Sequence, residues 1–129
     1  MELWEMIRAN LVTAMLPLII LVFGLFTRIG LPRKVNWLIG YRTSLACKNQ
    51  DTWAFAHRYW GKLMIVFGFV LTVLSVVGII LVARGVFTLE PALLLAVSAI
   101  ATVLAVVVSI IPTEIALRKE FDKSGQRRR

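Results

Sequence analysis

The polar segment of residues 36–62 contains the side chains with the most varied chemistry. Cys47, Asp51 and His57 lie close together in it, but their spacing matches no ligand pattern that holds zinc firmly. An enzyme would need an acid–base pair, which the chain offers only if His57 meets Asp51 or Glu114. The sequence has no glycine-rich phosphate loop and no nucleophile elbow. We therefore expect a protein that is not an enzyme and that carries no metal or cofactor.

An arginine of this segment has an acidic residue from the C-terminal part of the chain as a candidate partner. Arg42 follows Gly40 and Tyr41 in an expected turn, and Glu114 follows the last apolar run. A guanidinium group holds a carboxylate through two parallel N–H···O bonds. We therefore expect an ion pair between Arg42 and Glu114, with Asp51 as the alternative partner. A structural clamp is its simplest interpretation.

Three apolar runs must position these polar residues. Residues 9–27, 63–83 and 91–111 are each close to the roughly 20 residues that a helix needs to cross the hydrocarbon of a bilayer. The chain is 59% hydrophobic with a mean hydropathy of +0.82, which is more apolar than a typical soluble domain. The sequence therefore predicts a single all-α integral membrane domain, residues 1–129, with three transmembrane helices.

Local features refine the ends of the apolar runs. Acidic residues outnumber Arg8 ahead of the first run, and no small-residue cleavage pattern follows it, so we do not expect a cleaved signal peptide. Pro91 suits the first turn of the third helix, where its missing N–H would have no partner. Pro112 disfavours regular helix beyond the third run, with a kinked continuation as the alternative.

The basic residues are distributed unevenly among the polar segments. Residues 28–62 contain seven of the fifteen lysines and arginines and the tail after Pro112 contains six, whereas the other two polar segments contain one each. Positively charged segments remain in the cytoplasm, so we expect the N-terminus outside, with a cytoplasmic motif loop at 28–62 and a basic cytoplasmic tail at 113–129. This topology explains the net charge of +8 without nucleic-acid binding. We expect the tail to be mostly disordered, with attraction to anionic lipids as the alternative.

Each apolar run also carries a line of small or weakly polar residues at helical spacing. They are Asn10, Thr13, Pro17 and Gly24 in the first run, Gly61, Gly68, Thr72 and Ser75 in the second, and Ser98, Thr102, Ala105 and Ser109 in the third. Helices in a bilayer associate through close backbone approach and interhelical hydrogen bonds. We expect these lines to form the contacts of a three-helix bundle, with a ligand-lined groove as the alternative.

A further helix is expected within the motif loop, where Asn49 or Asp51 provides an N-terminal cap. Apolar side chains then recur on one helical face at Trp53, Ala56, Trp60 and Met64. Tryptophan and tyrosine favour the headgroup zone of a membrane. We therefore expect a cytoplasmic interfacial helix that continues directly into the second span.

The residues of the motif loop also resemble the signature of the SdpI family. The resemblance covers about residues 28–125 and includes the sequence Asn36-Trp37-x-x-Gly40-Tyr41-Arg42-Thr43. The matching residues that it makes candidates for binding, without assigned chemistry, are Asn36, Gly40, Tyr41, Arg42, Thr43, Asn49, Trp53, His57, Gly61 and Glu114.

The resemblance implies a function, because the family is named for a bacterial immunity protein against a secreted, membrane-disrupting peptide toxin. It implies a multi-pass protein of the bacterial cytoplasmic membrane that protects the cell by binding the toxin within or beside the lipid bilayer. It also implies a signalling role through a cytoplasmic regulator, since the immunity protein holds a transcriptional repressor at the membrane. That protein has additional spans ahead of the motif, whereas one span precedes it here. The alternative function is a small transporter or channel subunit that acts as a homo-oligomer.

Overall fold

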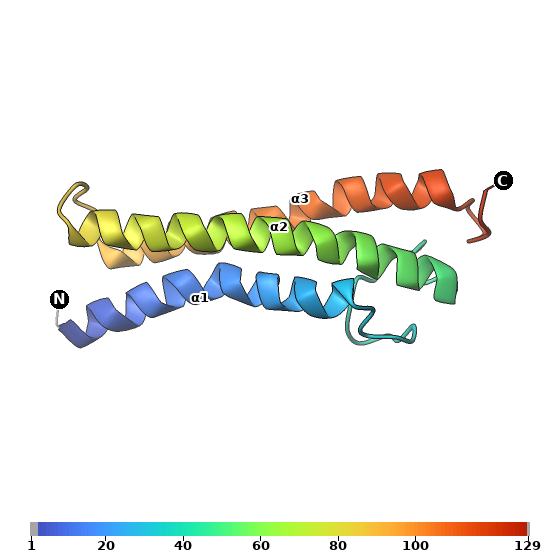
Figure 1. Ribbon diagram of the computed structural model, residues 1–129, viewed down its shortest axis with the longest axis horizontal. Coiled ribbons are helices and arrows are strands. Elements are labelled where there is room, and N and C mark those ends of the chain that lie inside the picture. Colours follow the sequence, from blue (N-terminus) through green and yellow to red (C-terminus); the bar gives the residue numbers. More distant parts are fainter. Residues whose placement is uncertain (1–2, 129) are drawn as a thin grey trace.

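Three long helices lie side by side in the computed structural model, which describes residues 3–128 (Figure 1). Helix α1 spans Leu3–Arg28, α2 spans Gln50–Ala83 and α3 spans Pro91–Glu120. The start of α1 and the α2–α3 connection lie at one end of the bundle, and the α1–α2 loop and the C-terminal tail lie at the other. Each helix is long and apolar enough to cross a membrane. The prediction of an all-α protein with three helices long and apolar enough to span a membrane is therefore confirmed.

The third helix extends further than the sequence pattern favoured. Pro112 lies inside α3, which continues to Glu120, so the alternative of a continued helix is the correct one. The proline ring removes one backbone donor, and hydroxyl groups near it donate to carbonyl groups of the adjoining turns. The Thr113 hydroxyl donates to the Ser109 carbonyl oxygen at 2.8 Å, and the Ser109 hydroxyl donates to the Val106 carbonyl oxygen at 2.5 Å.

The second helix begins with a complete capping box. The Asn49 side chain accepts a hydrogen bond from the Thr52 backbone N–H at 2.9 Å, and the Thr52 hydroxyl accepts one from the Asn49 N–H at 3.1 Å. Of the two caps expected from the sequence, Asn49 is the one used. The helix continues without a break into the second apolar run, as predicted, and its position at a membrane interface stays a prediction.

The tail folds back on this cap, so the expectation of a mostly disordered tail is wrong for the described residues up to 128. Phe121 is fully buried, and its ring meets Phe55 edge-on with centroids 5.6 Å apart. The Asn49 side-chain amide donates to the Gly125 carbonyl oxygen at 2.7 Å. Arg129, which belongs to the predicted tail, lies outside the described residues. One buried aromatic residue and one amide therefore order a segment whose charge suggested disorder.

Glycines bring α1 and α2 into backbone contact. A Cβ atom added to Gly61 would lie 2.6 Å from the backbone nitrogen of Arg28, and one added to Gly68 would lie 2.6 Å from that of Leu21. A Cβ atom on Gly24 would lie 2.7 Å from the Cβ of Met64. Distances this short exclude any side chain, and close approach of this kind is how helices associate in lipid.

Hydrogen bonds between small polar residues join α3 to the other two helices. The Ser98 hydroxyl donates to the Thr13 carbonyl oxygen at 2.8 Å and lies 3.4 Å from the Ser75 hydroxyl. The Trp60 indole N–H donates to the Ser109 hydroxyl at 2.8 Å. The buried members of the predicted lines are Thr13, Pro17, Gly24, Gly61, Gly68, Ser98, Thr102 and Ser109, and the half-buried ones are Asn10, Thr72, Ser75 and Ala105. These lines therefore form helix contacts, and the alternative of a ligand-lined groove stays a prediction, since Ala105 and the Ser75–Ser98 pair also border open pockets between α2 and α3.

The glycine contact can be tested with one methyl group. We expect Gly61→Ala to lower the free energy of unfolding by about 1–3 kcal/mol, because the added Cβ meets backbone atoms that cannot move independently. The matched control is Gly78→Ala on the same helix, where the nearest atom is Leu94 Cδ1 at 3.5 Å. Thermal unfolding in mild detergent measures both variants, and equal melting temperatures would contradict the close α1–α2 contact.

Candidate functional site

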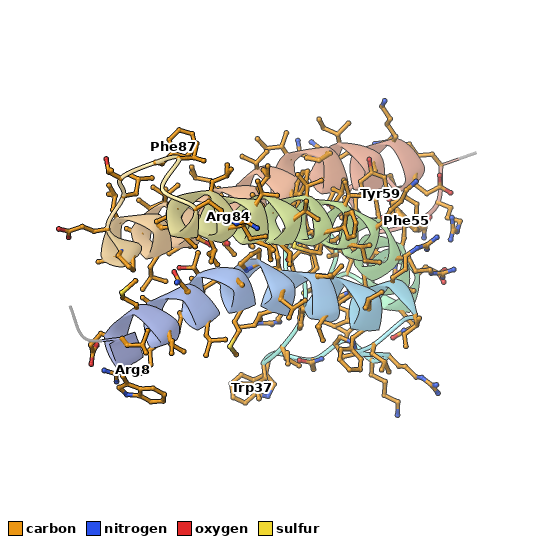
Figure 2. The ribbon with its side chains drawn as sticks, turned by 60° about the vertical axis from the view of Figure 1, so that its left-hand side comes forward. Arg8, Trp37, Phe55, Tyr59, Arg84 and Phe87 are labelled. Carbon is orange, nitrogen blue, oxygen red and sulfur yellow. The ribbon has the colours of Figure 1, made fainter. Side chains whose placement is uncertain are left out.

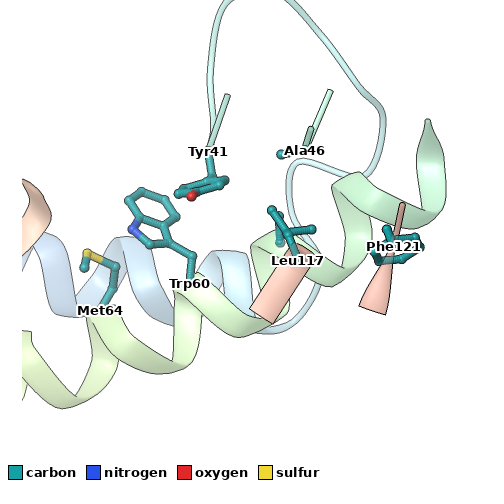
Figure 3. Packing of buried hydrophobic residues seen from close by; sticks show 7 residues of the cluster. Tyr41, Ala46, Trp60, Met64, Leu117 and Phe121 are labelled. Atoms are coloured by element: carbon teal, nitrogen blue, oxygen red, sulfur yellow. The ribbon is translucent and has the colours of Figure 1, made fainter. Parts of the chain in front are cut away.

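Tyr41 joins the α1–α2 loop to α2 and α3, and Figure 3 shows it beside Trp60 of α2. Its backbone N–H donates to His57 Nε2 on α2 at 2.9 Å, and its hydroxyl donates to Glu114 Oε1 on α3 at 2.7 Å. Its ring packs against Trp60 with centroids 5.3 Å apart. Burial raises the pKa of the Tyr41 phenol, and the hydrogen bond to Glu114 raises that pKa further. The phenol therefore stays protonated and remains a donor to the carboxylate.

The contact with Tyr41 fixes the protonation of His57. Because Nε2 accepts the N–H of Tyr41, the proton of the neutral ring must reside on Nδ1, which then donates to the Trp53 carbonyl oxygen at 2.8 Å. The ring is fully buried and lies 4.2 Å, centroid to centroid, from the Trp53 indole. Both nitrogens are occupied by backbone groups, so this imidazole is not free to transfer a proton or to bind a metal.

Gly40 and Trp53 hold the first half of the loop against this histidine. Gly40 has a φ angle of +117°, and a Cβ atom there would lie 2.5 Å from His57 Nε2, so both conformation and space require glycine. The Trp53 side chain is fully buried, and its indole N–H donates to the Pro32 carbonyl oxygen at 2.7 Å. The loop is therefore anchored on α2 at two separate points.

The predicted ion pair between Arg42 and Glu114 is wrong, as is the alternative pair with Asp51. Arg42 is exposed, and its Nε donates to the Asn36 carbonyl oxygen at 2.8 Å. Within residues 3–128 the ion pairs are Arg8–Glu5 and Arg127–Glu120. Tyr41 occupies the place beside Glu114, and burying a neutral hydroxyl group costs less than burying a guanidinium.

The other candidate residues serve the backbone around this contact. The Asn36 carboxamide oxygen accepts the N–H groups of Leu38 at 3.0 Å and Ile39 at 2.7 Å, which makes a tight turn. The Thr43 hydroxyl accepts the N–H of Ala46 at 3.4 Å. Asn49 caps α2 and Gly61 contacts α1, as described above. The structure thus gathers the family-like residues at one end of the bundle, and their role in binding stays a prediction.

The Asn36 turn presents three apolar side chains that the sequence pattern did not distinguish. Trp37, Leu38 and Ile39, which we call the loop tip, are 79%, 76% and 54% exposed. Figure 2 shows Trp37 directed away from the helices. The signal available in the sequence was three consecutive apolar residues between an Asn turn and Gly40. From the sequence alone, exposed Trp37 could not be distinguished from Tyr41, Trp53 and Trp60, which are buried aromatic residues of the same segment.

A pocket of about 410 Å³ opens between the loop, the end of α3 and the tail. Glu114 lines this pocket. Four cationic side chains also line it: Lys48, Arg118, Lys123 and Arg128. Asp122 is also on its wall, and hydrogen bonds from Ser124 and Gln126 lower the pKa of this carboxyl group. This mixed-charge pocket was missed because the tail was expected to be disordered.

One comparison with known proteins gave a match. The family model described as the SdpI/YfhL protein family matches residues 33–113, which run from the loop through α2 and most of α3. The searches of curated proteins and of solved structures each gave no significant match. The matched segment includes the loop tip and the anchoring residues Tyr41, Trp53 and His57. Pro32 and Glu114, which accept hydrogen bonds from Trp53 and Tyr41, each lie one residue outside it.

The hydrogen bond between Tyr41 and Glu114 predicts a measurable loss of stability. We expect Tyr41→Phe to lower the free energy of unfolding by about 1.5–3 kcal/mol, because it removes a part-buried hydrogen bond to a charged group. The matched control is Tyr59→Phe, since the half-buried Tyr59 stacks on Phe55 and its hydroxyl makes no hydrogen bond within residues 3–128. Thermal unfolding in mild detergent distinguishes the two, and an equal loss in both variants would show that the Glu114 contact adds nothing.

Proposed function

We propose that this chain, which belongs to the SdpI/YfhL protein family, confers immunity to a membrane-active peptide toxin, or senses one, by binding it. The observation that carries this proposal is that buried residues anchor the family-matched loop while its tip is exposed. Buried residues with satisfied hydrogen bonds hold the loop, and the loop tip they position is exposed. An ordered and exposed apolar tip suits a binding protein, since little ordering entropy is lost on association.

The composition of the exposed part fits peptide recognition. Tryptophan and arginine are the residue types most enriched at the energetic centres of protein interfaces. Trp37 is exposed, and so is Arg42, whose guanidinium bonds the Asn36 carbonyl oxygen through Nε and has no other hydrogen bond within residues 3–128. The loop therefore offers an apolar anchor and a cationic donor side by side.

Binding is favoured over catalysis by the state of the acid and base groups. The His57 ring bonds two backbone groups and is fully buried, and the Glu114 carboxylate accepts the Tyr41 hydroxyl. His57 and Glu114 thus both hold the loop in place, and the other candidate acid, Asp51, is exposed. Transport is the weaker alternative, because the small polar residues of the bundle make contacts between its own helices. A path for solutes would have to lie between several copies of the chain.

We further propose the bacterial cytoplasmic membrane as the location, with the N-terminus outside and the loop end inside. Support comes from the excess of lysine and arginine in the loop and tail, which lie together at one end of the bundle. In this orientation the loop tip is accessible to a peptide in the inner leaflet and to a cytoplasmic regulator.

Survival of a sensitive bacterium tests the proposed function. We expect expression of the chain to protect cells against a secreted membrane-disrupting peptide. Trp37→Ala should lower the peptide concentration that the cells survive about 30-fold, which corresponds to the roughly 2 kcal/mol of an interface hot spot. Arg42→Ala is expected to act in the same direction. The matched control is Trp4→Ala, an exposed tryptophan at the opposite end of the bundle, with membrane levels of all variants equalised by immunoblot.

Two outcomes would contradict this function. If folded wild-type protein protects against no member of a panel of such peptides, immunity is excluded. If Trp37→Ala and Trp4→Ala protect as well as wild type, the loop tip is not the contact surface. Solute flux into vesicles that contain only this chain would instead support the oligomeric transporter.

A further inference from the structure

A second pocket at the loop end of the bundle is lined by cations and aromatic rings without a carboxylate. Its volume is about 250 Å³, and it lies where the end of α1, the start of α2 and the tail meet. The lining residues are Arg28, Phe55, Arg58, Tyr59, Lys62 and Arg127. We call it the cationic pocket. It is separate from the mixed-charge pocket beside Glu114 and from the loop tip.

The glycine contact between α1 and α2 brings the cations together. Arg28 is the last residue of α1, and its backbone nitrogen would lie 2.6 Å from a Cβ atom at Gly61. Arg58 and Lys62 flank Gly61 on α2, one helical turn apart and therefore on one face. Three positive charges from two helices thus converge on one opening because the backbones touch there.

Within the described residues, acidic side chains pair with one of the four lining cations and leave the other three without an ion pair. Within residues 3–128 the only ion pair that involves a lining residue joins Arg127 to Glu120 at 2.5 Å. Arg58 makes a single long hydrogen bond, from Nε to the Ala54 carbonyl oxygen at 3.4 Å. Like charges four residues apart on a helix destabilise it, so the bare cluster is unfavourable and a bound anion would relieve the repulsion.

The surroundings of the pocket select an anion that carries apolar chains. Phe55 and Tyr59 form one wall, with their rings stacked at a centroid distance of 6.2 Å, and Figure 2 shows both at the loop end of the bundle. The α2 face that carries Arg58 and Lys62 continues at helical spacing into exposed apolar residues, Val66 and Phe69. Along this face of α2, basic side chains are followed by apolar ones, an order that matches the headgroup and acyl chains of a lipid.

We propose that the cationic pocket binds the phosphate headgroup of an anionic phospholipid. Arginine binds phosphate oxygens through two parallel hydrogen bonds, and basic pockets between transmembrane helices bind anionic headgroups. The site fixes one lipid at the junction of α1 and α2. It is independent of toxin recognition, since it shares no residue with the loop tip.

Native mass spectrometry of the full chain in mild detergent tests this site, with dioleoylphosphatidylglycerol or dioleoylphosphatidylcholine added. We expect preferential retention of one phosphatidylglycerol molecule. The double variant Arg58→Gln/Lys62→Gln should bind it about 25-fold more weakly, because each basic residue near a lipid surface contributes a factor of about five. The matched control Arg33→Gln/Lys34→Gln removes the same charge from exposed loop positions outside the pocket, and should stay within about two-fold of wild type.

Each contrary result overturns the site. Equal weakening in the control pair would show a diffuse surface attraction, and equal retention of phosphatidylcholine would show that charge is not recognised. Displacement of the lipid by millimolar inorganic phosphate alone would assign the pocket to a soluble anion. If the α2 double variant does not fold, Arg28→Gln on α1 provides the same comparison, with an expected weakening of about five-fold.

Discussion

The arrangement at the loop end depends on one buried contact, the hydrogen bond from the Tyr41 backbone to His57. This bond forces the histidine proton onto Nδ1, where the Trp53 carbonyl accepts it, and it places the Tyr41 hydroxyl beside Glu114. The neutral ring of His57 and the phenol of Tyr41 therefore join the loop to α2 and α3 without a buried ion pair. Such a fully satisfied polar network specifies a single conformation, because losing any member leaves the others unpaired in a desolvated site. The exposed loop tip inherits its position from this network.

Close contacts also hold together the three helices of the bundle. Lipid gives helices no hydrophobic reason to associate, so contact must come from close backbone approach and from hydrogen bonds. Gly24, Gly61 and Gly68 supply the first between α1 and α2, and the Ser98 and Ser109 hydroxyls supply the second to α3. Gly61 has a further effect, since the contact it permits sets Arg28 beside the basic face of α2. The close packing at Gly61 therefore also brings basic residues of two helices together.

Much of this architecture could be predicted from the sequence, because the signals are local or periodic. Apolar length gave the three spans, small-residue spacing gave the helix contacts, and the Asn49 cap gave the start of α2. The partner of Glu114 could not be predicted, since Tyr41 and Arg42 are adjacent and only the folded loop decides which of them faces α3. The order of the tail was missed for a similar reason. Its charge indicated disorder, whereas the contact of Phe121 with Phe55 and the hydrogen bond from Asn49 to Gly125 hold it in place.

The most direct test of the loop-closing contact uses the fact that the chain contains a single histidine. Nitrogen-15 NMR of selectively histidine-labelled protein in mild detergent reports the protonation of both ring nitrogens at neutral pH. The structure predicts a neutral ring with the proton on Nδ1 and an unprotonated Nε2 that accepts the Tyr41 N–H. A ring protonated at Nε2, or one that exchanges between tautomers as a free histidine does, would contradict the closed loop.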